Sequence, residues 1–143
     1  MILYLDTSAL VKLYVDEAAS DVVRRAVADV THVATSRVAY PEARAAFARR
    51  HLAGDFSRLD LRRVVAALDR DFSSLVVMEL GVAVATQAGE LAERHGLRGF
   101  DAIHLASALD CSRLLGVQPE FLTFDTRQAA AARNEGLHTL ALS

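Results

Sequence analysis

The 143-residue chain has the length of one domain, long enough to bury roughly 70% of its unfolded surface, and we expect residues 1–143 to form a single domain. Hydrophobic residues make up 52% of it, which excludes a disordered chain, and no apolar run approaches the ~18 residues of a membrane span. The net charge of −2 does not indicate a general nucleic-acid-binding protein, and a single cysteine with no signal-peptide pattern favours a soluble cytoplasmic protein.

Apolar runs alternate with helical patterns through the first part of the chain. In chain order they predict a strand over residues 2–5, a short helix over 9–14, a helix from Ser20 or Asp21 to about residue 30, a strand over 31–35 and a helix over 43–52. Pro41 either starts this last helix or kinks it after one turn, because proline lacks the N–H that a helix interior needs.

The second part continues the alternation. After a capping box at Ser57 it predicts a helix to Phe72, a strand over 75–78, a helix over 82–95 ended by Gly96, a helix from Asp101 to about 115, a strand over 120–124, a helix over 128–134 and a strand over 138–142. Strands that alternate with helices are typical of a parallel sheet covered by helices on both faces. The sequence therefore predicts an α/β fold.

The stretch from Phe100 to Ala106 places one acidic residue, Asp101, at the start of a segment that is otherwise apolar on nearly every side. A helix that is apolar all round is normally buried, and a buried carboxylate needs a partner or a metal ion. Helix capping is the simpler interpretation of Asp101 taken alone. His104, three residues later, is interpreted as a packed helix residue.

Two further acids follow strands directly, and a fourth begins a helix. Asp6 and Asp125 each stand between a strand and a helix, where each could also be a helix N-cap, and Glu42 follows Pro41. Because the carboxyl ends of parallel strands share one edge, we expect these acids and Asp101 to meet there. Such a cluster needs a counter-charge, and oxygen ligands without a zinc-type Cys or His pair favour Mg²⁺ or Mn²⁺.

These motifs, taken in chain order, resemble those of a known protein family. The segments Leu5-Asp6-Thr7-Ser8-Ala9, Glu42, Phe100 to Ala106 and Thr123-Phe124-Asp125 resemble the PIN-domain nuclease family, most closely its VapC-type toxins. The resemblance implies a PIN-like three-layer α/β/α fold whose central parallel sheet has about four to five strands. It also implies a metal-dependent endoribonuclease with Asp6, Glu42, Asp101 and Asp125 as catalytic and metal-binding residues.

Other expectations concern the substrate and partners. The resemblance places Ser8 near the metal ion and implies a VapB-like antitoxin and a homodimer. Four arginines near the motifs are our candidates for contacts with the phosphates of an RNA substrate: Arg37, Arg44, Arg98 and Arg127. Surface solubility or structural ion pairs would explain each of them at least as well.

Three alternatives compete with this function. A receiver-type domain needs a lysine late in the chain, and the only lysine is Lys12. A haloacid-dehalogenase-type phosphatase needs an Asp two residues after the first, where Ser8 stands. The remaining alternative is a catalytically inactive or solitary PIN domain that acts as an RNA- or protein-binding module.

Overall fold

A five-stranded parallel sheet forms the centre of the computed structural model, which describes residues 1–140. The strands are β1 (Ile2–Leu5), β2 (His32–Ser36), β3 (Val76–Met78), β4 (Glu120–Leu122) and β5 (His138–Thr139). They lie side by side in the order β3-β2-β1-β4-β5, and every pairing is parallel. The predicted parallel sheet is confirmed. The end of the predicted last strand, residues 141 and 142, lies outside the described residues.

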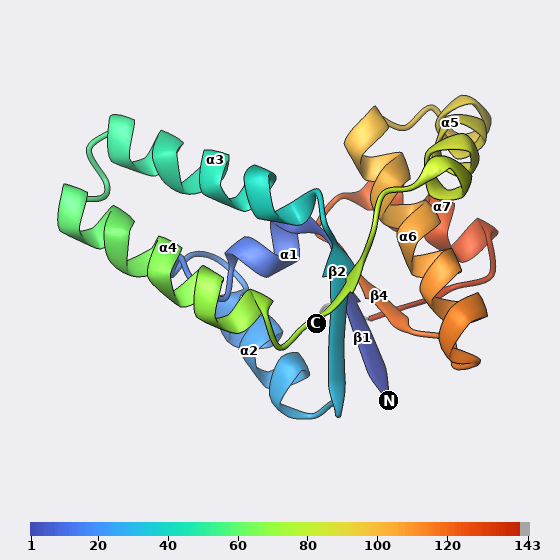
Figure 1. The fold of residues 1–143 in the computed structure, drawn as a ribbon, viewed down its shortest axis with the longest axis horizontal. Coiled ribbons are helices and arrows are strands. Elements are labelled where there is room, and N and C mark those ends of the chain that lie inside the picture. The colour runs from blue at the N-terminus through green and yellow to red at the C-terminus, as the bar shows by residue number, and fades with distance from the viewer. Residues whose placement is uncertain (141–143) are drawn as a thin grey trace.

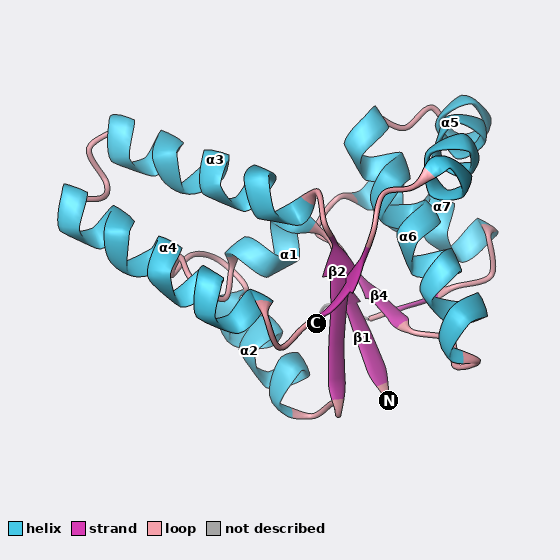
Figure 2. Cartoon of the chain, in the orientation of Figure 1, coloured by secondary structure: helices cyan, strands magenta, loops and turns pink. Residues whose placement is uncertain are grey.

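Helices cover both faces of this sheet (Figures 1 and 2). They are α1 (Thr7–Val11), α2 (Ser20–Ala28), α3 (Ala39–Leu52), α4 (Arg58–Phe72), α5 (Val82–His95), α6 (Gly99–Leu115) and α7 (Thr126–Asn134). The first four pack on one face and the last three on the other, which confirms the three-layer α/β/α architecture. None of the helices within residues 1–140 is long and apolar enough to cross a membrane.

The central strand β1 shows why the sheet is buried on both faces. Ile2 and Tyr4 belong to the core beneath α5, α6 and α7, whereas Leu3 and Leu5 belong to the core beneath α1 to α4. Side chains alternate between the faces of a strand, so a continuous apolar run supplies both cores at once. The run ends at Asp6, at the carboxyl edge of the sheet.

Capping residues that can be recognised in the sequence determine several of the helix ends. The capping box at Ser57 is present, and Gly96 ends α5 with a left-handed φ of 64°. The predicted cap of α2 by Ser20 or Asp21 is wrong, because Ala19 is the N-cap residue. The Ser20 hydroxyl instead donates to the Val15 carbonyl oxygen at 3.0 Å and accepts from the Glu17 N–H at 3.1 Å, which closes the preceding turn.

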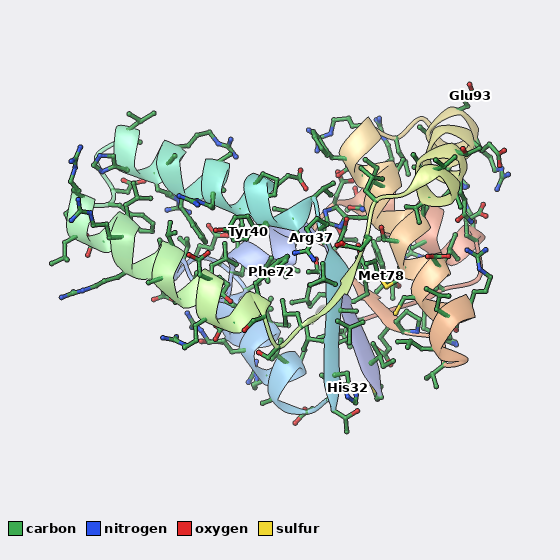
Figure 3. The ribbon with its side chains drawn as sticks, viewed as in Figure 1. His32, Arg37, Tyr40, Phe72, Met78 and Glu93 are labelled. Atoms are coloured by element: carbon green, nitrogen blue, oxygen red, sulfur yellow. The ribbon has the colours of Figure 1, made fainter. Side chains whose placement is uncertain are left out.

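Helices α3 and α4 form an antiparallel pair that projects away from the sheet (Figure 1). At its base, the Tyr40 and Phe72 rings meet edge to face with centroids 5.4 Å apart, and the Arg37 guanidinium lies 5.7 Å from the centre of the Phe72 ring (Figure 3). Pro41 lies in the first turn of α3, where its missing N–H does no harm. The helix starts before Pro41, at Ala39.

Helix α6 is the buried apolar helix that the sequence predicted. Ala102, Leu105 and Ala106 are fully buried, and the helix packs between α5, α7 and the sheet. The capping interpretation of Asp101 is wrong, since the N-cap residue is Arg98 and Asp101 lies in the first helical turn. Its carboxylate therefore has no capping role that would account for it.

Candidate active site

The structure brings the four predicted acids to one cavity. Asp6, Glu42, Asp101 and Asp125 all line a cavity of about 610 Å³ at the carboxyl edge of the sheet. Asp6 is the N-cap residue of α1 and Asp125 that of α7, while Glu42 and Asp101 lie in the first turns of α3 and α6. Helix N-termini carry partial positive charge, which lowers the repulsion among these carboxylates.

Asp6 is the most deeply buried of the four, with 4% of its surface exposed. Its carboxylate accepts hydrogen bonds from the Ser8 hydroxyl at 2.7 Å, the Ala9 N–H at 2.9 Å and the Thr123 hydroxyl at 2.6 Å. Burial raises the pKa of Asp6, although nearby His104 and these hydrogen bonds act in the opposite direction. The ionised carboxylate is thus held in one orientation at an energetic penalty that a cation would offset.

A buried network holds Glu42. Its Oε1 atom accepts from the Thr7 hydroxyl at 2.5 Å and lies 3.1 Å from Nε2 of His104. Nδ1 of His104 lies 2.9 Å from the Tyr4 hydroxyl, and burial raises the pKa of Tyr4 well above its usual value, so the hydroxyl stays protonated. Nε2 of His104 also lies 2.9 Å from the Thr7 hydroxyl, so His104 links Tyr4 to Thr7 and Glu42 in one network.

The ionisation of Glu42 follows from the same contacts. Burial tends to raise its pKa, but the hydrogen bonds from His104 and Thr7, together with the nearby charges of His104 and Arg98, outweigh burial, so the net effect lowers the pKa of Glu42. His104 is indeed a packed residue, 2% exposed, as the sequence suggested. Its direct contact with a predicted site acid was missed, although its spacing of three residues from Asp101 places both on one helix face.

Asp101 and Asp125 share a counter-charge. Nε of Arg98 lies 3.1 Å from Oδ2 of Asp101, and Nη2 of Arg98 lies 3.9 Å from Oδ2 of Asp125. Asp125 also accepts from the backbone N–H groups of Arg127 and Gln128 at 2.9 and 3.1 Å. Because the Arg98 side chain is 82% exposed, it can leave these carboxylates without disturbing the core.

The other arginine candidates do not line the acidic cavity, although the side cavity that Arg127 borders is also lined by Asp101 and Asp125. Arg127 borders a neighbouring cavity and its Nη1 donates to the Gly96 carbonyl oxygen at 3.4 Å. Arg37 pairs with Glu79, and Arg44 donates to the Tyr40 hydroxyl at 3.2 Å. Neither Arg37 nor Arg44 lines the acidic cavity, so the structure does not bring them to the predicted site.

The donor set suits a hard divalent cation. The four side chains offer carboxylate oxygens, with the hydroxyls of Thr7 and Ser8 beside them, and such oxygens are preferred by Mg²⁺ and Mn²⁺. Within residues 1–140, no three Asp, Glu, His or Cys side chains are already gathered closely enough to hold an ion. Internal donors and Arg98 hold the carboxylates instead, and a bound cation would replace some of these contacts.

Sequence comparison places the protein in a family. The sequence pattern of the PIN domain matches residues 3–134, so the chain belongs to the PIN-domain family. Within it, the chain is similar to Ribonuclease VapC45 of Mycobacterium tuberculosis strain CDC 1551 / Oshkosh, with 37% identity over 108 residues, 76% of this chain and 75% of that protein.

Structural comparison agrees on the fold. The crystal structure of M. tuberculosis VapC20, described as a sarcin-ricin loop cleaving toxin, has a TM-score of 0.71 and 23% identity, with 98% of each chain covered. A toxin-antitoxin complex from Klebsiella pneumoniae has a TM-score of 0.63 and 18% identity, with 90% of each chain covered. Both therefore share the three-layer architecture of this chain.

Substitutions at Tyr4 and His104 can test the buried network that these residues form with Glu42. We expect His104→Ala to lower the free energy of unfolding by about 2–4 kcal/mol, because it opens a cavity and leaves the buried Tyr4 hydroxyl without its hydrogen-bond partner. Adding Tyr4→Phe should recover part of that loss, with a coupling free energy of at least ~0.5 kcal/mol in a double-mutant cycle followed by urea unfolding. Strict additivity of the two substitutions would contradict the contact.

Proposed function

We propose that this protein is a Mg²⁺- or Mn²⁺-dependent endoribonuclease, the toxin of a toxin–antitoxin pair, which hydrolyses RNA phosphodiester bonds at Asp6, Glu42, Asp101 and Asp125. The observation that carries the proposal is the convergence of these four carboxylates, from four separate segments, on one cavity of about 610 Å³. The name of its relative, Ribonuclease VapC45, supports the choice of RNA as substrate.

Asp6 and Asp101 are the proposed principal ligands of the ion, with Asp125 and Glu42 completing the site directly or through water. A bound divalent cation would polarise the phosphoryl oxygen, favour ionisation of a water molecule and stabilise the leaving alkoxide. Arg98 is the group that must move, because it pairs with both Asp101 and Asp125. Once displaced, its guanidinium is free to contact a substrate phosphate.

Side chains of the protein can orient the attacking water molecule and the Asp6 carboxylate. Glu42 is ionised and fixed by Thr7 and His104, so it can accept a hydrogen bond from the attacking water and orient it. Thr123 and Ser8 hold the Asp6 carboxylate in a single orientation. Among the predicted auxiliary contacts, Ser8 and Arg98 line the cavity, whereas we assign Arg127 only to a flanking phosphate.

We also propose the partners that the sequence suggested: a VapB-like antitoxin and a second copy of this chain in a homodimer. The structural similarity to a chain of a toxin-antitoxin complex supports the antitoxin. We further infer action in the reducing cytoplasm, since the single cysteine, Cys111, is free and buried.

An inactive PIN domain that only binds RNA or protein is the second candidate. The observation that favours it is the ion pair of Arg98 with Asp101, which neutralises one proposed ligand within the chain itself. The presence of all four acids at one cavity favours the nuclease. Only an activity measurement separates the two.

The first measurement is cleavage of single-stranded RNA by the purified protein in Mg²⁺ or Mn²⁺ and in EDTA. We expect cleavage that EDTA abolishes, together with a metal-dependent rise in Tm. An ion present at a hundred times its Kd stabilises the fold by about 2.7 kcal/mol. A folded protein that gains stability from metal but cuts no RNA would support the binding module, and cleavage that persists in EDTA would contradict the proposed metal dependence.

A further inference from the structure

A second cavity of about 610 Å³ adjoins the acidic one. The two share five lining residues, namely Thr7, Ser8, Glu42, Arg49 and Phe100. The second cavity then continues between α1 and α3 as far as Lys12, Arg50 and Asp55. If an RNA strand binds at the four carboxylates, the second cavity is thus a groove in which its adjoining nucleotides could lie.

Phe100 is the unusual residue at the junction of the two cavities. All six phenylalanines and all three tyrosines lie within residues 1–140, and Phe100 is the only one of them that is exposed, at 55%. It belongs to neither hydrophobic core, whereas its helix buries the neighbouring Ala102 and Leu105 completely. The fold therefore leaves an aromatic side chain next to Asp101 that packing does not explain.

Arg49 supplies a positive charge at the same junction. It follows Glu42 by two turns of α3, about 10 Å along the helix axis, and lines both cavities. Within residues 1–140 Arg49 makes no ion pair, whereas its neighbour Arg50 is paired with Glu17 and Asp55, and Lys12 with Glu17. Arg49 is thus the basic side chain of this groove that internal acids leave available.

We infer that Phe100 and Arg49 form a subsite for single-stranded RNA next to the position of cleavage. An unpaired base stacks on the Phe100 ring, and Arg49 contacts the phosphate of a neighbouring nucleotide. Aromatic stacking beside a positive charge is the usual means of holding single strands, and a paired base within a duplex offers no free face. The inference rests on the proposed ribonuclease function and adds to it a requirement for unpaired RNA.

The absence of tryptophan from the sequence gives a direct probe. In Phe100→Trp the only indole lies at the proposed stacking position, and we expect a single-stranded oligonucleotide to quench its fluorescence while the same sequence in a duplex does not. Val82→Trp is the matched control, because Val82 is 86% exposed and lines neither cavity. Equal quenching of both variants, or of Phe100→Trp by duplex, would overturn the inference.

RNA affinity and RNA cleavage test the same subsite in variants that carry no tryptophan probe. Phe100→Ala should weaken binding of single-stranded RNA about tenfold or more, and Phe100→Leu should not restore it, since leucine keeps apolar area but has no π face. Arg49→Gln should weaken binding and reduce the slope of log K against log salt by about 0.7, whereas Arg62→Gln on the exposed face of α4 should do neither.

These results separate the subsite from the proposed catalysis. Stacking by Phe100→Trp in a protein that cuts no RNA would support the subsite and contradict the nuclease. Metal-dependent cleavage by the wild type, with Phe100→Ala and Arg49→Gln binding and cutting like the wild type, would support the nuclease and overturn the subsite.

Discussion

Asp101→Asn is expected to leave a folded protein whose metal-dependent RNA cleavage is about 10³-fold slower or undetectable. Asparagine keeps the shape of the side chain but removes the negative charge at one of the two proposed principal ligands. The metal ion contributes several kcal/mol to the stabilisation of the transition state, and ~4 kcal/mol corresponds to about 10³ in rate. The Asp101 side chain is only 17% exposed, so the change acts inside the cavity rather than at the open surface.

Asp21→Asn is the matched control for this substitution. Asp21 also lies in the first turn of a helix and pairs with an arginine three residues away, Arg24, at 3.3 Å, but it does not line the acidic cavity. We expect wild-type cleavage from this variant, measured with the same oligonucleotide and ion. Activity that survives in Asp101→Asn would point to a contaminating nuclease and overturn the assignment of the site.

The sequence predicted the site well where local chemistry and topology coincide. Asp6 and Asp125 follow buried strands of a parallel sheet, so their meeting at one edge follows from the direction of the strands. In the structure both are also helix N-caps, which means that the capping interpretation and the shared cavity are compatible. A capping Asp holds its carboxylate at the helix start, and that is the position from which it reaches the cavity.

The supporting residues could not be predicted, because their partners are remote in the sequence. Thr123 and Asp6 are 117 residues apart, and Tyr4 and His104 are 100 apart, yet each pair is joined by a hydrogen bond. Thr123 belongs to the Thr123-Phe124-Asp125 motif, but nothing in that motif indicates that its hydroxyl donates to Asp6. It was predicted to lie inside a strand over 120–124, but β4 ends at Leu122, and the hydroxyl of Thr123 turns toward Asp6.

The placement of Glu42 after Pro41 was likewise undecided by spacing. The structure places both residues in the first turn of α3, where four backbone N–H groups have no partner within the helix in any case. Glu42 is consequently aimed at the cavity by the direction of α3 and by its contacts with Thr7 and His104. The cavity thus depends on where the N-terminal turns of separate helices meet, which is a property of the whole sheet.

Asp6→Asn should abolish metal-dependent cleavage and at the same time raise the Tm of the metal-free protein by about 3 °C, the shift that roughly 1 kcal/mol produces in a domain of this size. The Thr123 hydroxyl has one hydrogen but faces two acceptors, Oδ2 of Asp6 at 2.6 Å and Oε1 of Gln128 at 2.9 Å. In the variant the new amide can donate to Thr123, which frees that hydrogen for Gln128.

The pH dependence of this stabilisation tests its cause. Burial raises the pKa of Asp6 above 3.8, so in the range above 3.8 the folded state holds a proton that the unfolded chain has released. The contribution of Asp6 to stability is therefore lost as the pH rises through its folded pKa. The stability advantage of Asp6→Asn should be largest above that folded pKa and should shrink as the pH falls below it. Thermal unfolding in EDTA across this range measures it.

Divalent metal ions should reverse the order of stability of the wild type and Asp6→Asn. The ionised Asp6 carboxylate of the wild type is destabilised by burial, so a divalent cation at the site offsets that penalty and raises the wild-type Tm, while Asp6→Asn lacks the charge and should respond only weakly. If Mg²⁺ or Mn²⁺ stabilised both proteins equally, the ion would bind elsewhere. If Asp6→Asn were less stable than the wild type without metal, the buried carboxylate would stabilise the fold. It would not then be a metal ligand that destabilises the metal-free protein.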